Sequence, residues 1–130
     1  NQTGYNPSQN FGVGVVFNNV QSSRGTNASN ALDTSDGKVT VPVDGVYLLE
    51  GSVYSTTSCF TQAWFTVGGG RMPYSDWVPH TGNHSIINAA TTHYLSANAE
   101  VGFHPYGSSH TSVTIVETYN HTWFKVTLIG

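Results

Sequence analysis

An all-β sandwich or jelly roll of antiparallel strands is the fold class that the sequence predicts, and three observations support it. Valine, threonine and aromatic residues recur at alternate positions, which is typical of strands with one buried face. Glycine, proline and asparagine interrupt this pattern every ~8–12 residues, the turn spacing of sandwiches and barrels. No window shows the ~3.6-residue apolar period of an amphipathic helix. Short strands without helices must bury their apolar faces against one another, as in two packed sheets.

The strand pattern can be followed along the chain. A first strand is expected at 11–17, and a long polar connection at 18–37. Further strands are expected at 38–41, 46–54, 59–67, 85–95, 101–106, 112–117 and 123–129. Gly68 to Gly70 break the pattern, and the Pro- and Gly-containing residues 70–83 predict a surface loop. The polar residues 1–10 are expected to be a flexible lead-in from an upstream stalk, which leaves 11–130 as one domain.

Composition excludes several classes of function. Only 8% of the 130 residues are charged, and four Lys plus Arg against seven Asp plus Glu give a net charge of −3. A nucleic-acid partner is not expected, since phosphate binding depends on clustered cations. No apolar run approaches the ~20 residues of a membrane-spanning helix, so membrane insertion is not expected either. Neutral Ser-, Thr- and Asn-rich β proteins are frequent outside cells, and we expect an extracellular or virion-surface location.

The motifs of catalysis and of metal binding are missing from the sequence. It contains no Gly-rich phosphate loop and no Gly-x-Ser-x-Gly elbow, and its acids are scattered without a spacing that predicts a catalytic pair. Cys59 is the single cysteine, so no internal disulfide can form. Of the six histidines only His80 and His84 are four apart, in a Pro/Gly loop without Cys or Asp support. We expect no enzyme, no cofactor and no metal site.

One stretch predicts a ligand-binding loop. Aromatic side chains flanked by charged and polar ones suit a sugar, because the rings stack on its apolar face and the polar groups bind its hydroxyls. The alternative is a loop that packs its own aromatics onto the sandwich. The candidate residues are Arg71, Tyr74, Asp76, Trp77 and His80.

Residues 38–54 carry the most specific pattern, Lys-Val-Thr-Val-Pro-Val-Asp-Gly-Val-Tyr-Leu-Leu-Glu-Gly-Ser-Val-Tyr. This stretch resembles the signature of C1q/TNF-like domains, in which a short strand ends in proline, a glycine turn follows and a Gly-x-Tyr strand crosses the core. Pro42, Gly45 and Tyr47 occupy those places. Segments 16–20, 63–69, 94–101 and 122–130 resemble other strands of the family in the same order, so the resemblance covers roughly 11–130. Gly68-Gly69, Ala99-Glu100 and Lys125 depart from the family pattern, which leaves its calcium sites and local turns open.

The resemblance implies a jelly roll of about ten strands that assembles as a homotrimer. Alternation within 46–54 points the same way, because apolar residues occupy both faces of that strand. A strand that is apolar on both faces is covered on both sides, and a subunit interface would supply the second cover. The alternative is a surface sheet with a few stray apolar residues. The expected interface residues are Val46, Leu48, Glu50, Tyr54, His104, Tyr106, Trp123 and Lys125.

Two charged positions within that set lead to a sharper expectation. Glu50 and Lys125 interrupt otherwise uncharged strands, and the fold that the sequence resembles makes those strands neighbours. An unpaired buried charge is costly, so we predict a Glu50–Lys125 ion pair, within one subunit or across the interface. His104, beside Gly102 and Tyr106, is expected to face the threefold axis, where three copies could hold an ion.

The predicted function is a non-catalytic trimeric recognition head. Within the resemblance, the low charge and the Asn, Thr and Gly bias look most like bacterial or phage C1q-like heads of fibres and spikes. The expected partner is then a host-cell glycan or receptor, with the head carried on an upstream stalk or shaft. Two alternatives stay open: a secreted eukaryotic C1q- or cytokine-like ligand of protein receptors, and a structural cap that only trimerises its stalk.

Overall fold

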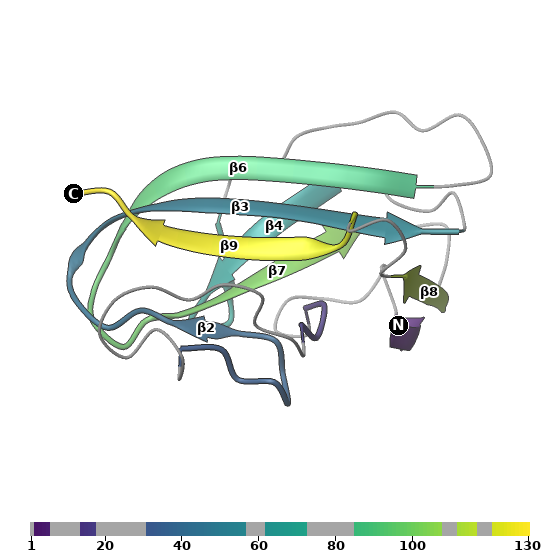
Figure 1. The fold of residues 1–130 in the computed structure, drawn as a ribbon, viewed down its shortest axis with the longest axis horizontal. Coiled ribbons are helices and arrows are strands. Elements are labelled where there is room, and N and C mark those ends of the chain that lie inside the picture. Colours follow the sequence, from purple (N-terminus) through teal and green to yellow (C-terminus); the bar gives the residue numbers. More distant parts are fainter. Residues whose placement is uncertain are drawn as a thin grey trace.

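The computed structural model describes residues 2–5, 14–17, 31–56, 62–72, 85–107, 112–116 and 121–130. Within these ranges the chain forms nine strands and no helix (Figure 1). The strands are β1 (Gln2–Tyr5), β2 (Val39–Thr40), β3 (Gly45–Ser55), β4 (Gln62–Val67), β5 (Gly70–Arg71), β6 (Ser85–Leu95), β7 (Glu100–Tyr106), β8 (Val113–Val116) and β9 (Trp123–Leu128). The all-β class predicted from the sequence is confirmed.

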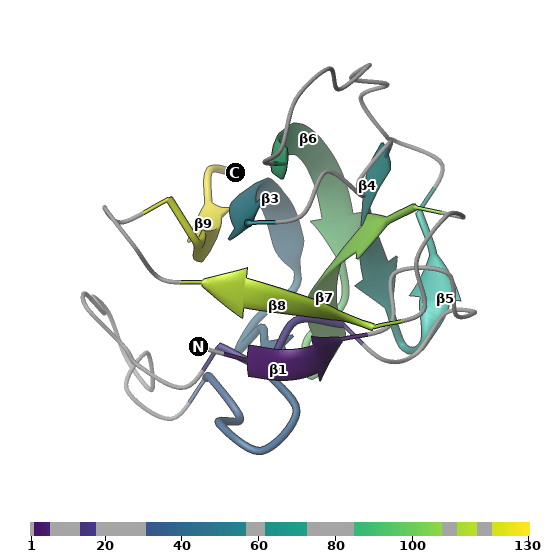
Figure 2. The same ribbon diagram turned by 90° about the vertical axis from the view of Figure 1, so that its right-hand side faces the viewer.

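The strands form two antiparallel sheets that face each other. One sheet has five strands in the order β1-β8-β3-β6, with β9 also paired to β3. The other has four strands in the order β2-β7-β4-β5. β6 pairs with β3 along the whole of both strands, so β8 and β9 share the opposite edge of β3. Figure 1 shows β3 between β6 and β9 in the larger sheet, with β4 and β7 crossing behind it, and Figure 2 shows β1 beside β8.

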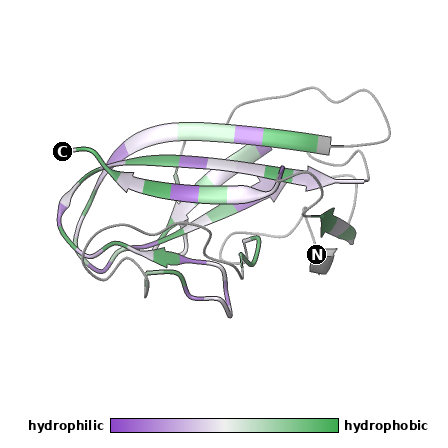
Figure 3. Ribbon diagram, in the orientation of Figure 1, coloured by the Kyte–Doolittle hydropathy of each residue, from purple (hydrophilic) through white to green (hydrophobic). Residues whose placement is uncertain are grey.

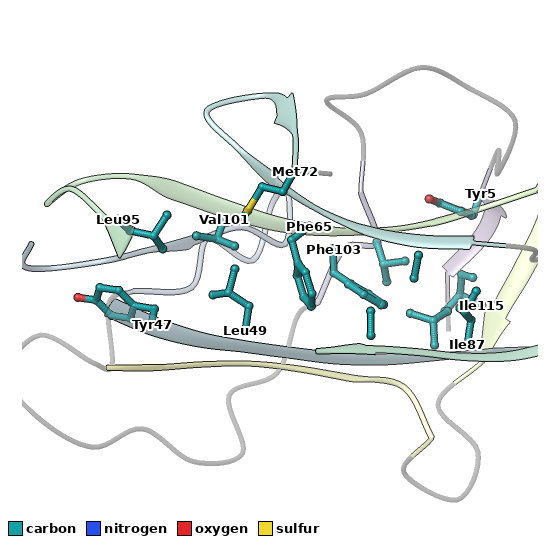
Figure 4. Packing of buried hydrophobic residues seen from close by; sticks show 14 of the residues in the cluster. Tyr5, Tyr47, Leu49, Phe65, Met72, Ile87, Leu95, Val101, Phe103 and Ile115 are labelled. Carbon is teal, nitrogen blue, oxygen red and sulfur yellow. The ribbon is translucent and has the colours of Figure 1, made fainter. Parts of the chain in front are cut away.

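The core lies between the two sheets and follows from the alternation along each strand. On β3, Tyr47, Leu49 and Val53 are buried, whereas Val46 is exposed and Leu48 is half-buried. Successive side chains of a strand point to opposite faces, so every second residue of β3 enters the core. Figure 4 shows Tyr47 and Leu49 of β3 facing Val101, Phe65 and Phe103 of the four-stranded sheet.

Three phenylalanines fill the middle of the core. Phe65 and Phe103 come from the four-stranded sheet and Phe124 from β9, and their ring centroids lie 5.2–6.2 Å apart. Gly51 of β3 makes room for them, because a Cβ atom at this position would lie 2.9 Å from the Phe103 ring. Aromatic rings at these separations stabilise one another beyond the area they bury. The spacing between the sheets therefore depends on a glycine opposite a large ring.

Most predicted strands are confirmed, with small shifts at their ends. The expected strand at 85–95 has the bounds of β6, and the expected strand at 46–54 is extended at each end in β3. Residues 38–41, 101–106, 112–117 and 123–129 correspond to β2, β7, β8 and β9. Residues 62–67 of the expected strand 59–67 form β4, and 59–61 lie outside the described residues.

Three expectations are corrected. Residues 1–10 were expected to be a lead-in, but Gln2–Tyr5 forms β1, pairs with β8 and buries the Tyr5 ring (Figure 2). The described part of the expected strand 11–17, Gly14 to Phe17, is not a strand, although the Val15 N–H donates to the Phe103 carbonyl. Gly68 and Gly69 adopt the positive φ of a tight turn, and the chain then forms β5 where a loop was expected to begin.

Candidate functional site

The outward face of the five-stranded sheet brings together most of the predicted interface residues. We call the outward positions of its three longest strands the β9-β3-β6 face. Its members are Val46, Leu48, Glu50, Ser52 and Tyr54 of β3, Ile86, Asn88, Ala90, Thr92 and Tyr94 of β6, and Trp123, Lys125 and Thr127 of β9. Strand pairing places these residues in rows across the sheet, such as Lys125, Glu50 and Ala90.

Large hydrophobic side chains of this face lie in contact with solvent. The exposed fractions are 37% for Val46 and Ile86, 42% for Trp123 and 59% for Tyr94. Pairing places Tyr94 opposite Val46 and Ile86 opposite Tyr54, so the exposed residues recur along the length of the sheet. Figure 3 shows a hydrophilic band between hydrophobic bands along β9. Val46 and Tyr94 form an exposed apolar pair near one end of the face, and Ile86 and Trp123 lie toward the other end, opposite Tyr54 and Ser52.

The predicted ion pair between Glu50 and Lys125 is confirmed within one subunit. The two residues are directly paired across β3 and β9, and Lys125 Nζ lies 3.4 Å from Glu50 Oε2. The side chains are 29% exposed for Glu50 and 60% exposed for Lys125. In the single chain this pair is therefore partly hydrated, and an exposed pair contributes only about 0–1 kcal/mol to stability.

The end of the face near Tyr54 is held by the segment that leads into β9. The Tyr54 N–H donates to Thr122 Oγ1 over 3.1 Å, and the same hydroxyl donates to the Val116 carbonyl over 2.6 Å. One threonine side chain thus joins β3 to the end of β8. The Tyr54 ring also meets the edge of His121, with centroids 5.9 Å apart. The His121 ring therefore lies beside the Tyr54 ring at this end of the face.

Sequence reasoning did not identify two of the most exposed members, Ile86 and Tyr94. Both belong to β6, whose bounds were predicted correctly. The available signal was alternation, because Ile87, Ala89 and Leu95 are buried and the residues between them are not. The pairing partner of β6 was needed to show that its outward residues continue the face of β3.

His104 and Tyr106 do not belong to this face, and the burial of His104 corrects its predicted place at a threefold axis. Both lie on β7 in the four-stranded sheet. The His104 side chain is fully buried in its own subunit, where Nδ1 lies 3.2 Å from the Tyr5 hydroxyl and the ring meets Trp64 edge-on. A ring that is covered by its own chain cannot point to a threefold axis. Tyr106 packs edge-on against Trp64, with centroids 4.8 Å apart.

Of the predicted ligand-binding loop, only Arg71 lies within the described residues. Tyr74, Asp76, Trp77 and His80 lie outside them. Arg71 ends β5 and is exposed, and its guanidinium carbon lies 3.7 Å from the centroid of the Trp64 ring. Such a cation–π contact orients the guanidinium at the edge of the four-stranded sheet, at the point where the chain enters the predicted loop.

Across the described ranges, no three His, Cys, Asp or Glu residues lie close enough to hold a metal ion. The same ranges contain no helix that is long and apolar enough to cross a membrane. A second ion pair joins Lys38 Nζ to Asp36 Oδ2 over 2.8 Å, in the turn before β2. The hydrogen bond that the Lys38 ammonium donates to the Asp36 carboxylate raises the pKa of Lys38 above its usual value.

Comparison with known proteins identifies the fold. No protein-family model matches the chain, and no curated protein matches it in sequence. Among solved structures, the globular domain of zebrafish complement 1qA protein is similar over 100% of this chain and 92% of its own, with a TM-score of 0.62 and 17% identity. The Eiger TNF of S. frugiperda is similar over 82% of this chain and 76% of its own, with a TM-score of 0.56 and 12% identity. The chain therefore has the C1q/TNF-like jelly-roll fold.

Proposed function

We propose that this protein is a non-catalytic recognition head that acts as a homotrimer, with the β9-β3-β6 face as its subunit interface. The observation that carries the proposal is that exposed hydrophobic side chains recur along that face. A second copy of the chain is the occupant that the charges favour. Glu50 and Lys125 neutralise each other there, so the face of a chain with net charge −3 does not repel its own copy.

The energetics require a broad contact. Covering apolar surface contributes about 25 cal/mol per Å², and association costs about 4–15 kcal/mol in lost translational and rotational freedom. Four partly exposed side chains cannot offset that cost by themselves. The face extends over β3, β6 and β9, two of which are 11 residues long, and this length supplies the remaining contact area.

The trimer is tested by light scattering during size-exclusion chromatography at micromolar concentration. The expected mass is about 42 kDa, three times the 14.0 kDa of the chain. Val46→Glu introduces a charge into the face and is expected to shift the mass toward the single chain. Val43→Glu is the matched control, because Val43 is 47% exposed but lies in the turn before β3. A wild-type mass near that of one chain at high concentration contradicts the proposal.

The proposal also concerns the ligand that the head binds and the structure that carries the head. A fibre or spike tip that binds a host glycan or receptor is the role expected from the composition. Similarity to a complement 1qA globular domain and to a TNF favours the alternative of a secreted ligand that binds protein receptors. Both roles place the head on a virion surface or outside the cell.

A glycan array probed with the purified wild-type protein separates these roles. Binding to specific glycans supports the first, and Tyr74→Ala combined with Trp77→Ala is then expected to abolish it without changing the melting temperature. Loss of folding in that variant would show that the two aromatics belong to the core. An array without any bound glycan argues against a glycan-binding head.

A further inference from the structure

Glu50 and Lys125 are the only charged residues of the β9-β3-β6 face. All other outward positions of β3, β6 and β9 are apolar, hydroxyl-bearing or amide residues. Glu50 lies midway along β3, with Leu48 and Ser52 as its neighbours on the same face. Lys125 lies midway along β9, between Trp123 and Thr127. A chain with 8% charged residues thus places two opposite charges, joined to each other, midway along a face that carries several exposed hydrophobic side chains.

Covering this face with a second subunit changes the contribution of the Glu50–Lys125 pair to the free energy of association. Both side chains reach water in the single chain, where Lys125 is 60% exposed. A second subunit on the face removes that water, and each charge then depends on the other for compensation. A pair that is complete before assembly brings no net charge into the interface. A subunit that lacks one partner would bring an isolated charge into an apolar contact, which is strongly unfavourable.

We propose that the Glu50–Lys125 pair is the self-recognition element of the subunit interface. This inference rests on the proposed homotrimer. The pair admits a second copy of this chain, whose face is equally neutral, and rejects a chain of the same fold that presents an unpaired charge at these positions. Specificity of this kind comes from the penalty on the wrong partner more than from attraction to the right one.

Single charge reversals test the penalty. Glu50→Lys and Lys125→Glu each leave two like charges at the centre of the face, and each is expected to lower the association constant of the trimer by about 30-fold or more. The exchanged variant, Glu50→Lys with Lys125→Glu, restores the neutral pair and is expected to return the constant toward the wild-type value. Lys38→Glu is the matched control, because Lys38 is also half of an ion pair but lies in the turn before β2.

Subunit exchange tests selectivity directly. Wild-type protein is mixed with a tagged variant under conditions that allow exchange, and native mass spectrometry counts the mixed trimers. Tagged Lys38→Glu chains are expected to enter wild-type trimers in binomial proportions, and tagged Glu50→Lys chains to be largely excluded. A pair that matters only inside one subunit would alter the stability of the single chain and leave both the association constant and the mixing unchanged.

The outcomes separate this inference from the proposed trimer. A monomeric wild type overturns the trimer, and the inference with it. A trimeric wild type whose Glu50→Lys variant assembles and mixes as well as the control overturns the inference alone. Circular dichroism and melting curves establish that each variant folds. If a reversed charge prevents folding, Glu50→Gln and Lys125→Met replace it, and equal association of both with the wild type again overturns the inference.

Discussion

Replacing Gly51 by alanine tests how the two sheets face each other. The new methyl group would lie 2.9 Å from Cδ2 and 3.0 Å from Cγ and Cε2 of Phe103, which is closer than carbon atoms pack. The Phe103 ring is buried and already packs against Phe65 and Phe124, whose centroids lie 5.2 and 6.2 Å from its own. Overpacking of this kind costs about 1–3 kcal/mol. Alanine in place of a strand glycine also restricts the unfolded chain, which stabilises the fold by about 0.4–1 kcal/mol. The difference is a net loss of about 0–2.6 kcal/mol, with the middle of the range near 1 kcal/mol.

Urea denaturation followed by tryptophan fluorescence measures this loss, at one protein concentration because association would contribute to the apparent stability. Gly70→Ala is the matched control: its added methyl group meets only the Val67 carbonyl, at 3.4 Å, and should change stability by less than about 0.5 kcal/mol. Phe103→Leu should make Gly51→Ala less costly, with a coupling of about 0.5–3 kcal/mol. If Gly51→Ala is neutral and uncoupled from Phe103, the packing of β3 against β7 described here is wrong.

Two further predictions concern single hydrogen-bonded groups. The buried Tyr5 hydroxyl donates to the Pro105 carbonyl over 2.9 Å and lies 3.2 Å from His104 Nδ1, so Tyr5→Phe should lower the free energy of unfolding by about 1–3 kcal/mol. An unchanged free energy of unfolding would show that the hydrogen bond of the Tyr5 hydroxyl does not stabilise the docking of β1. The Ser35 hydroxyl and N–H donate to Asp33, and these bonds lower the pKa of its carboxyl. Their stabilising effect is complete above the usual carboxyl pKa and is lost as the pH falls through the lowered one. Ser35→Ala should raise the pKa of Asp33 in an NMR titration, and an unchanged titration would contradict this cause.

The Glu50–Lys125 ion pair was predictable because it depends on two facts only. The two residues lie on the same face of their strands, and the two strands are neighbours. Glu50 shares a face with Val46 and Leu48 by alternation, and the resemblance of residues 38–54 to a C1q/TNF-like signature placed the closing strand beside β3. The pairing of β3 with β6 over all 11 residues could not be predicted from alternation. Nothing local in residues 85–95 shows that Tyr94 lies opposite Val46, because pairing partners are distant in sequence.

His104 shows where the sequence pattern reaches its limit. Phe103 and His104 are successive residues of β7, so their side chains point to opposite faces of the four-stranded sheet, and Phe103 is the one that enters the core. By pattern alone that side could meet solvent, a second subunit or more of the same chain. The structure buries the ring beside Tyr5, which is 99 residues earlier in the sequence. Its place could not be predicted because the covering residue belongs to a segment that reads as a polar lead-in.

The all-β class, the positions of most strands and the residues that share each strand face follow from local sequence patterns. They depend on local chemistry, since the two-residue period of a strand and the backbone freedom of glycine act within a few residues. Which of those faces the chain itself covers follows only from the packing of distant segments. It buries His104 and leaves Val46, Tyr94 and Trp123 exposed. The physical reason is that burial depends on contacts between segments far apart in the chain, and a local period carries no information about them.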